Sequence, residues 1–243
     1  MSDHHPLYGA AASRFLNAAF ARIITKVDDL FEEGGREAIR IVAGLFLVLD
    51  HKNGGDSTSE ELIRRFRMLD LTSENIIDFY YLGWIEYSGG LYDPKQELEF
   101  CLPDFQACRR TLKKDYGVSD FGGYADLILV DAERDTSGNY PRYFLHFEEA
   151  IRIDLAKSIK SGDIPSLGEF LESLIKAADE FRSEQPTSGG AYYVSDKLGL
   201  MYAKQSMLTS IFDKWGKFIG ANTLKHLAVR NLGGTAEIYP GDF

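Results

Sequence analysis

Cysteine, proline and positive charge are scarce in this chain of 243 residues. It has two cysteines and seven prolines, and its 27 Lys and Arg residues are outnumbered by 37 Asp and Glu residues, for a formal net charge of −10. Two cysteines are too few for a disulfide framework or a zinc site, so we expect a reducing, cytoplasmic location. A chain this acidic gains nothing from bulk attraction to DNA or anionic lipid, so any contact with nucleic acid requires a local basic patch.

Long apolar runs are also missing. The longest, at residues 41–49, is interrupted by Gly44 and is far shorter than the ~20 residues needed to span a bilayer. The N-terminus begins with polar residues and lacks the pattern of a signal peptide. The sequence therefore predicts a protein with no membrane partner.

Sequence motifs of catalysis are absent as well: the chain contains no HExxH, GxSxG or CxxC, and its glycines do not have P-loop spacing. One cluster bears on catalysis, His146 with Glu148, which share a face if residues 125–130 and 142–147 are paired strands. Acidic residues lie upstream of it: Asp126, Asp131 and Glu133. The lysine that a strand-carboxylate nuclease needs is missing, so we interpret the cluster as a surface turn. We expect no enzyme activity, no cofactor and no metal.

Apolar residues at helical spacing are the main signal that is present. The elements predicted for the first half of the chain are helices at residues 10–33, 36–49, 57–66 and 73–82, followed by a β-hairpin at residues 84–87 and 98–102. A capping box formed by Ser57 with Glu60, or by Thr58 with Glu61, is expected to open the third of these helices.

The helix order at residues 36–102 resembles the winged helix-turn-helix of MarR-type regulators. That resemblance implies an α+β fold, predominantly α, in which a winged-helix domain follows an N-terminal helix and precedes a mostly helical C-terminal domain. The expected boundaries are residues 1–34 for the tail and first helix, 35–116 for the winged-helix domain and 117–243 for the C-terminal domain.

The C-terminal half is predicted from turn and cap signals. A helix at residues 103–116 ends at Gly117, and the runs at 125–130 and 142–147 form a hairpin or give way to a helix over 148–159. Further elements are expected at these positions: a helix from the cap at Ser166, a linker at 184–191, a helix from Ser195 to about Lys217, a short helix at 222–229 and a partly extended tail.

DNA readers of the winged-helix type use basic and amide side chains on the third helix. Here that helix has no Lys or Arg, and it carries Glu74 and Asp78, which repel phosphates. The residues that remain as candidate DNA contacts are Arg64, Arg65, Arg67, Asn75, Lys95, Arg109 and Arg110. A DNA-binding transcriptional regulator of MarR-like type is therefore the alternative hypothesis.

Aromatic residues dominate the same predicted helix. Because Phe79, Tyr80 and Tyr81 are consecutive, they cannot all point inward, and with Trp84 they are candidate protein-interface residues. More weakly, the pattern resembles the kite-type or middle-component adapter subunits of SMC-like ATPase systems, some of which belong to defence complexes. The leading hypothesis is a non-enzymatic adapter or regulatory subunit in a larger assembly, with a protein partner or as a homo-oligomer.

Overall fold

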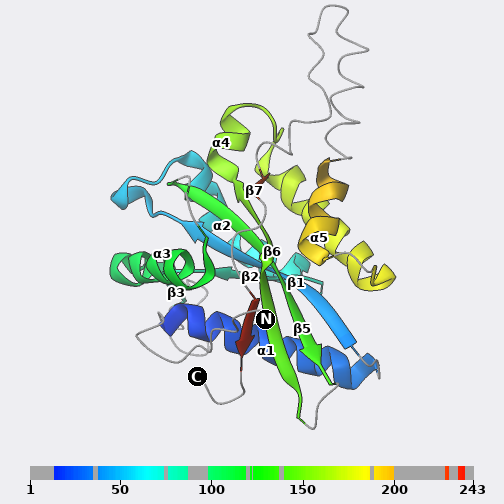
Figure 1. Ribbon diagram of the computed structural model, residues 1–243. Helices are drawn as coiled ribbons and strands as arrows, with labels where there is room; N and C mark the ends of the chain where they lie inside the picture. The colour runs from blue at the N-terminus through cyan, green and yellow to red at the C-terminus, as the bar shows by residue number, and fades with distance from the viewer. Residues whose placement is uncertain are drawn as a thin grey trace, which may run out of the picture.

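One mixed β-sheet organises the molecule (Figure 1). The computed structural model describes residues 14–34, 38–73, 76–86, 98–118, 121, 123–136, 140–186, 189–199, 228–229 and 235–238. The strands of the sheet are β1 (Ala38–Val48), β2 (Asp78–Tyr81), β5 (Ala125–Asp135), β6 (Arg142–Asp154), β7 (Ala228–Val229) and β8 (Thr235–Ile238). Their order is β2-β1-β5-β6, and β7 and β8 both pair with β6. β2 is parallel to β1, and the other pairs are antiparallel.

The remaining elements are helices and a small hairpin. They are α1 (Arg14–Gly34), the 3₁₀ turn η1 (His51–Asn53), α2 (Ser57–Ser73), the paired strands β3 (Trp84–Glu86) and β4 (Leu98–Phe100), α3 (Leu102–Tyr116), α4 (Leu155–Lys160), α5 (Leu167–Glu184) and a helix at residues 190–199.

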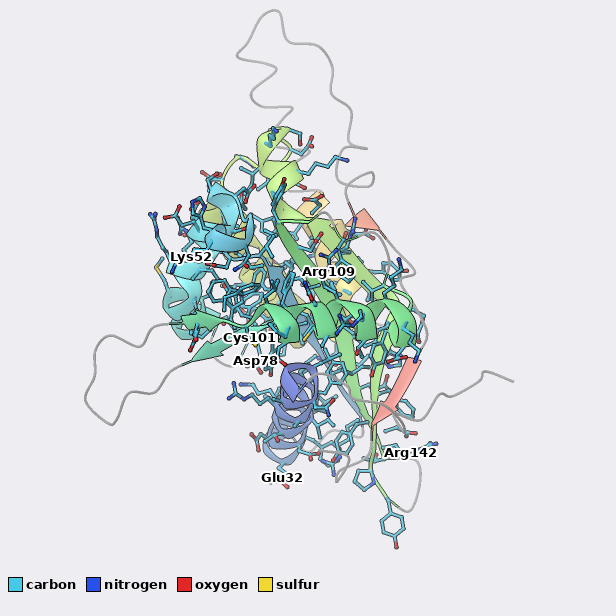
Figure 2. The ribbon with its side chains drawn as sticks, turned by 90° about the vertical axis from the view of Figure 1, so that its left-hand side faces the viewer. Glu32, Lys52, Asp78, Cys101, Arg109 and Arg142 are labelled. Carbon is cyan, nitrogen blue, oxygen red and sulfur yellow. The ribbon has the colours of Figure 1, made fainter. Side chains whose placement is uncertain are left out.

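Helices cover both faces of the sheet. On one face α1 and α3 pack against alternate residues of β1, such as Ile41 and Leu45. On the other face α2, α4, α5 and the helix at 190–199 pack against the intervening residues, such as Val42 and Phe46. Figure 2 shows α3 crossing in front of the strands on the α1 side. The sheet is therefore the middle layer of three.

The expected predominantly α, winged-helix fold is wrong, because the structure is an α/β fold built on this mixed sheet. Residues 38–48 of the predicted helix at 36–49 are strand β1, and the predicted helix at 73–82 contains strand β2, with residues 74–75 outside the described part. The cause is burial on both faces: every residue from Ile41 to Val48 is buried. A strand buried on both sides loses the alternation of apolar and polar residues that identifies strands.

Other predicted elements are confirmed. Helices α1, α2 and α3 lie where the sequence placed them, and β3 and β4 form the first hairpin. Of the two alternatives for the next segment, the hairpin of β5 and β6 is confirmed, whereas the helix over residues 148–159 is wrong for residues 148–154, which belong to β6. The C-terminal helix begins at residue 190, not at the predicted cap Ser195, and its predicted continuation to Lys217 lies outside the described residues. Of the short helix predicted at 222–229, residues 228–229 are strand β7, and the rest is likewise outside. The tail is extended at β8.

Strand β1 pairs with β5 along its whole length, from Ala38 opposite Asp135 to Val48 opposite Ala125. These strands come from the two sides of the domain boundary expected at residue 117. Both sides of that boundary therefore contribute to one sheet.

Candidate functional site: a groove between α2 and α5

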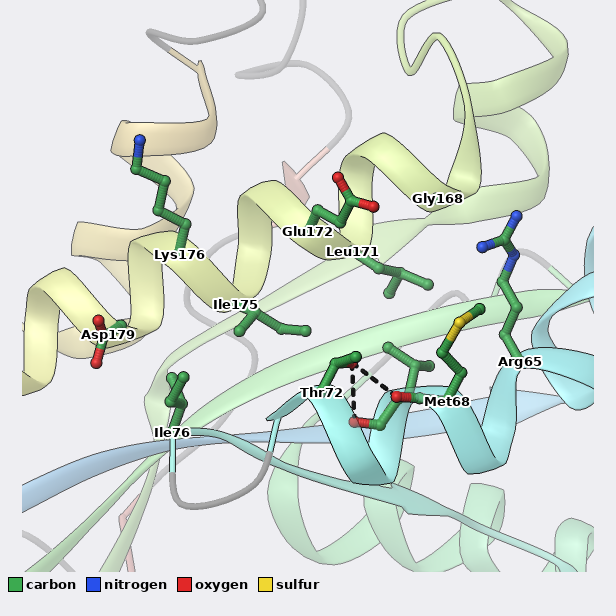
Figure 3. Close-up of a pocket in the computed structure, with 11 residues that line it drawn as sticks. Arg65, Met68, Thr72, Ile76, Gly168, Leu171, Glu172, Ile175, Lys176 and Asp179 are labelled. Atoms are coloured by element: carbon green, nitrogen blue, oxygen red, sulfur yellow. Dashed lines mark hydrogen bonds between the residues drawn. The ribbon is translucent and has the colours of Figure 1, made fainter.

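Two helical stripes face each other across a groove of about 410 Å³ between α2 and α5 (Figure 3). The lining residues are Arg65, Met68, Leu69 and Thr72 from α2, Ile76 just after it, and Gly168, Leu171, Glu172, Ile175, Lys176 and Asp179 from α5. On each helix they recur at spacings of three and four residues, which is the spacing of a single helix face. The groove is therefore formed by one continuous face of each helix.

Local capping places the two helices. The Oδ1 atom of Asp56 accepts a hydrogen bond from the backbone N–H of Ser59 (3.0 Å), which satisfies a free donor at the start of α2. The predicted capping boxes at Ser57 and Thr58 are wrong, because both residues already lie inside the helix. The predicted start of α5 is confirmed: the Ser166 hydroxyl oxygen accepts a hydrogen bond from the Glu169 N–H (3.2 Å).

The floor of the groove is apolar. Leu69 and Leu171 are buried within the core on this side of the sheet, and Ile175 packs partly against it. The hydroxyl of Thr72 donates to the carbonyl oxygens of Met68 (2.7 Å) and Leu69, so its polar group is satisfied within α2 (Figure 3). Met68 is 52% exposed and points into the groove. Its flexible thioether side chain adapts to the shape of a partner.

Charged side chains of both signs form the rim. Glu172, Lys176 and Asp179 are exposed on α5. Arg65 closes one end: it pairs with Glu61 (2.9 Å), and a Cβ atom added to Gly168 would lie 3.2 Å from its guanidinium group. The absence of a side chain at Gly168 therefore lets α2 and α5 approach at this end.

Comparisons with known proteins return no match. No protein-family model fits the chain, and no curated protein and no solved structure matches it. They therefore neither support nor exclude a family relationship to MarR-type regulators or kite-type adapters. The function has to be argued from the geometry.

The four aromatic residues predicted at a protein interface do not line this groove. Tyr81 and Trp84 are buried, and each uses its polar atom internally: the Tyr81 hydroxyl donates to the Leu62 carbonyl (3.3 Å) and the Trp84 Nε1–H to the Val48 carbonyl (2.8 Å). Phe79 and Tyr80 are half-buried in β2. Strand β2 thus places Phe79 against the core on the α2 side of the sheet and Tyr80 against the core on the α1 side.

The predicted DNA contacts whose side chains the structure describes are not brought together. Arg64 and Arg65 on α2 form ion pairs with Glu60 and Glu61, one helical turn away. The arginines of α3 lie on the opposite face of the sheet: Arg109 stacks over Phe121 (4.9 Å to the ring centroid), and Arg110 is exposed (Figure 2). Three further candidates lie outside the described side chains: Arg67, Asn75 and Lys95.

The His146 cluster is real, but it is not the predicted surface turn. His146 and Glu148 share one face of β6, as expected for paired strands, and His146 is only 14% exposed at its side chain. Its Nε2 lies 3.0 Å from Glu133 and its Nδ1 3.2 Å from Glu148. Arg40 on β1 also donates to Glu133 (2.7 Å). Asp126 is elsewhere, beside Arg152 (3.8 Å).

Among the described residues, no group of three or more His, Cys, Asp or Glu side chains is arranged to hold a metal ion. None of the described helices combines the length and the apolar character that a membrane span requires.

Sequence reasoning did not find the groove. The sequence predicts a helix from the cap at Ser166, but nothing in it marks one face of that helix, or Met68, as the wall of a groove. The groove depends on α2 and α5 being neighbours, although they are about a hundred residues apart in the chain.

Proposed function

We propose that this protein is a non-enzymatic adapter that binds an amphipathic helix of a partner protein in the groove between α2 and α5. The observation that carries the proposal is the apolar floor surrounded by charged side chains of both signs. Protein interfaces have this composition, with an apolar centre and a polar rim. Burial of the exposed Met68 under a partner removes apolar surface from water, which favours association.

The length of the groove supports a helix as the occupant. Its α5 wall extends from Gly168 to Asp179, which corresponds to about 16 Å at 1.5 Å per residue. That distance matches about three turns of a bound helix, whose apolar residues at i, i+3, i+4 and i+7 occupy such grooves. A drug-sized molecule is instead held in a compact cavity that buries most of its surface.

The charges of the rim support a polypeptide over a nucleic acid. Lys176 lies between two acidic residues of α5, Glu172 and Asp179, and the whole chain carries a net charge of −10. DNA binding depends on neutralising phosphates with an excess of Lys and Arg. Because Arg64 and Arg65 are paired with glutamates, no specific observation favours the DNA-binding alternative.

A photo-cross-linking amino acid at position 68 of the full-length chain tests the proposal. We expect irradiation in the native host to join it to one defined polypeptide, and a synthetic helical peptide from the cross-linked region to bind the purified protein. Ile175→Glu should weaken that binding at least about tenfold, since it places a charge on the apolar floor. Circular dichroism establishes that the variant is folded.

The matched control is at Lys113, which is exposed on α3 on the opposite side of the sheet. A cross-linker there should not capture the same polypeptide, and Lys113→Glu should leave peptide affinity unchanged. Equal capture from both positions, or peptide affinity that Ile175→Glu does not alter, contradicts the proposal. A salt-dependent mobility shift of duplex DNA that is lost on replacing Arg64 and Arg65 supports the DNA-binding alternative instead.

A further inference from the structure

One buried carboxylate attaches the helix at residues 190–199 to the sheet. Asp131 in β5 is 0% exposed. Its Oδ1 accepts a hydrogen bond from the backbone N–H of Ala191 (2.6 Å), and its Oδ2 accepts one from the N–H of Gly190. Both donors belong to the first turn of the helix, where free N–H groups carry partial positive charge. The carboxylate therefore caps the helix from a neighbouring strand.

The chain fits tightly at this point. A Cβ atom on Gly190 would lie 2.5 Å from Val42 and 2.7 Å from Phe181, and one on Gly189 would lie 2.2 Å from Oε2 of Glu149. No side chain fits between the strands and α5 here. The contact is therefore a close-packed junction, and it depends on two glycines that bring the backbone onto Asp131.

A second carboxyl group lies beside the first. The position of a Cβ atom on Gly189 is 2.2 Å from Oε2 of Glu149 and 3.0 Å from Oδ2 of Asp131, so both oxygens adjoin the same point. Glu149 Oε2 is buried and has no hydrogen-bond partner among the described residues. A like charge beside a buried carboxylate favours the binding of a proton to that carboxylate, here Asp131.

The other charged groups around this junction already have partners. Arg40 on β1 and His146 on β6 both hold Glu133, the next residue on this face of β5. On the helix itself, Lys197 pairs with Glu180 (2.8 Å) and Tyr193 donates to Glu184 (2.7 Å). The Arg40 guanidinium also attracts Asp131 and Glu149, but its hydrogen bond goes to Glu133.

We propose that Asp131, with Glu149 beside it, is a pH-sensitive latch that holds the helix at residues 190–199 against the sheet more tightly in mild acid than at alkaline pH. Undocking the helix returns Asp131 to water, where the ionised form is favoured. The docked state binds the proton better, so lowering the pH favours docking. The latch uses none of the residues that line the groove between α2 and α5.

The direction and range follow from the titration of Asp131. Burial raises the pKa of Asp131 from its ordinary value of 3.8 to about 6, although the two backbone N–H donors and Arg40 oppose that rise. A raised pKa means that the contribution to docking is complete below about pH 4 and is lost as the pH rises through 6. Between pH 5 and pH 7.5 docking should weaken by about tenfold.

Hydrogen exchange of the amides at residues 190–199, corrected for intrinsic rates, measures docking directly. In the wild-type full chain we expect protection to fall about tenfold from pH 5 to pH 7.5. Asp131→Asn keeps an acceptor oxygen but has no proton to gain, so the fall should disappear. Glu149→Gln removes the neighbouring charge and should make the fall smaller.

Asp154→Asn is the matched control. Asp154 caps α4 in the same way, accepting from the Lys157 N–H (2.9 Å), but it lies at the surface. This variant should show the wild-type fall at residues 190–199. The proposal is overturned if protection in the wild type does not change with pH. It is also overturned if protection in Asp131→Asn falls as much between pH 5 and pH 7.5 as it does in the wild type. If Asp131→Asn does not fold, Glu149→Gln provides the test. A fall in protection in Glu149→Gln that equals the wild-type fall then overturns the proposal.

Discussion

His146 lies between two carboxylates and interacts with both through its ring nitrogens. Both nitrogens donate at once only when the imidazole is protonated. Burial by itself lowers the pKa of His146, but the hydrogen bonds to Glu133 and Glu148 outweigh that effect and raise it to about 9. His146 therefore carries a positive charge at neutral pH and links β5 to β6.

His146→Ala should lower the free energy of unfolding by about 1–3 kcal/mol at pH 6.5, because it removes charged hydrogen bonds from a largely buried site. The pKa of folded His146 lies above its ordinary value of 6.5. The stabilisation of the fold by His146 is therefore complete below pH 6.5 and is lost as the pH rises through 9. Urea unfolding of the wild type and the variant should show that the free energy of unfolding lost on substitution is smaller at pH 10 than at pH 6.5.

The exposed His51 in η1 provides the control for this experiment. His51→Ala should change stability little at either pH. A penalty for His146→Ala that is equal at the two pH values argues against the ion-paired imidazole.

The junction between β2, β3 and α3 depends on Gly83. Its φ is +86°, in the region that L side chains rarely adopt, and a Cβ atom there would lie 2.6 Å from Cβ of Phe105 in α3. Its carbonyl oxygen also accepts a hydrogen bond from the Cys101 N–H (2.8 Å), at the start of α3. Gly83 thus permits both the turn and the close approach of the helix.

Gly83→Ala should therefore lower stability through backbone strain and through a clash with Phe105, by about 2–4 kcal/mol together. Gly123 offers a comparison, because its φ is +110° and nothing lies within 4 Å of its Cβ position. Gly123→Ala should cost only the strain, about 1 kcal/mol. Thermal unfolding of both variants measures the difference, and equal losses would show that the contact with Phe105 is unimportant.

Strand β1, like β2, lies where the sequence predicts a helix. The apolar residues of the predicted helix, at 39, 42, 45, 46 and 49, fit a helical repeat, but they are part of a nearly continuous apolar run. Both a buried strand and a buried helix have such a run, and only the surroundings distinguish them. Here α1 and α3 cover one face of the strand, and α2 and α5 cover the other.

The whole molecule is held together by the sheet, which pairs β1 with β5 across the middle of the chain. Separating the chain between residues 118 and 119 would expose one edge of β1 and one edge of β5, and much of both buried faces. Two such fragments lose the long-range pairing on which each half of the core depends.

We therefore expect fragments 1–118 and 119–243, expressed separately, to lack cooperative unfolding, whereas the full chain unfolds in a single transition. Near-ultraviolet circular dichroism and urea titration measure this. A fragment 1–118 that unfolds cooperatively by itself would show that the first half has an independent core.

The sequence by itself determined the elements whose signals are local. The helical stripe of α1, the stop of α3 at Gly117 and the start of α5 at Ser166 each depend on residues within a few positions of one another. The hairpin of β5 and β6, and with it the shared face of His146 and Glu148, was one of two alternatives that the sequence left open, the other being a helix over residues 148–159.

Only the tertiary structure decided what lies next to what. It made residues 38–48 a central strand, brought α2 and α5 together to form the groove, and placed Asp131 under the helix at residues 190–199. Each of these features joins segments that are distant in the chain. The free energy that selects them comes from burying both faces of one sheet, and that burial is a property of the assembled core, which no single stretch of sequence contains.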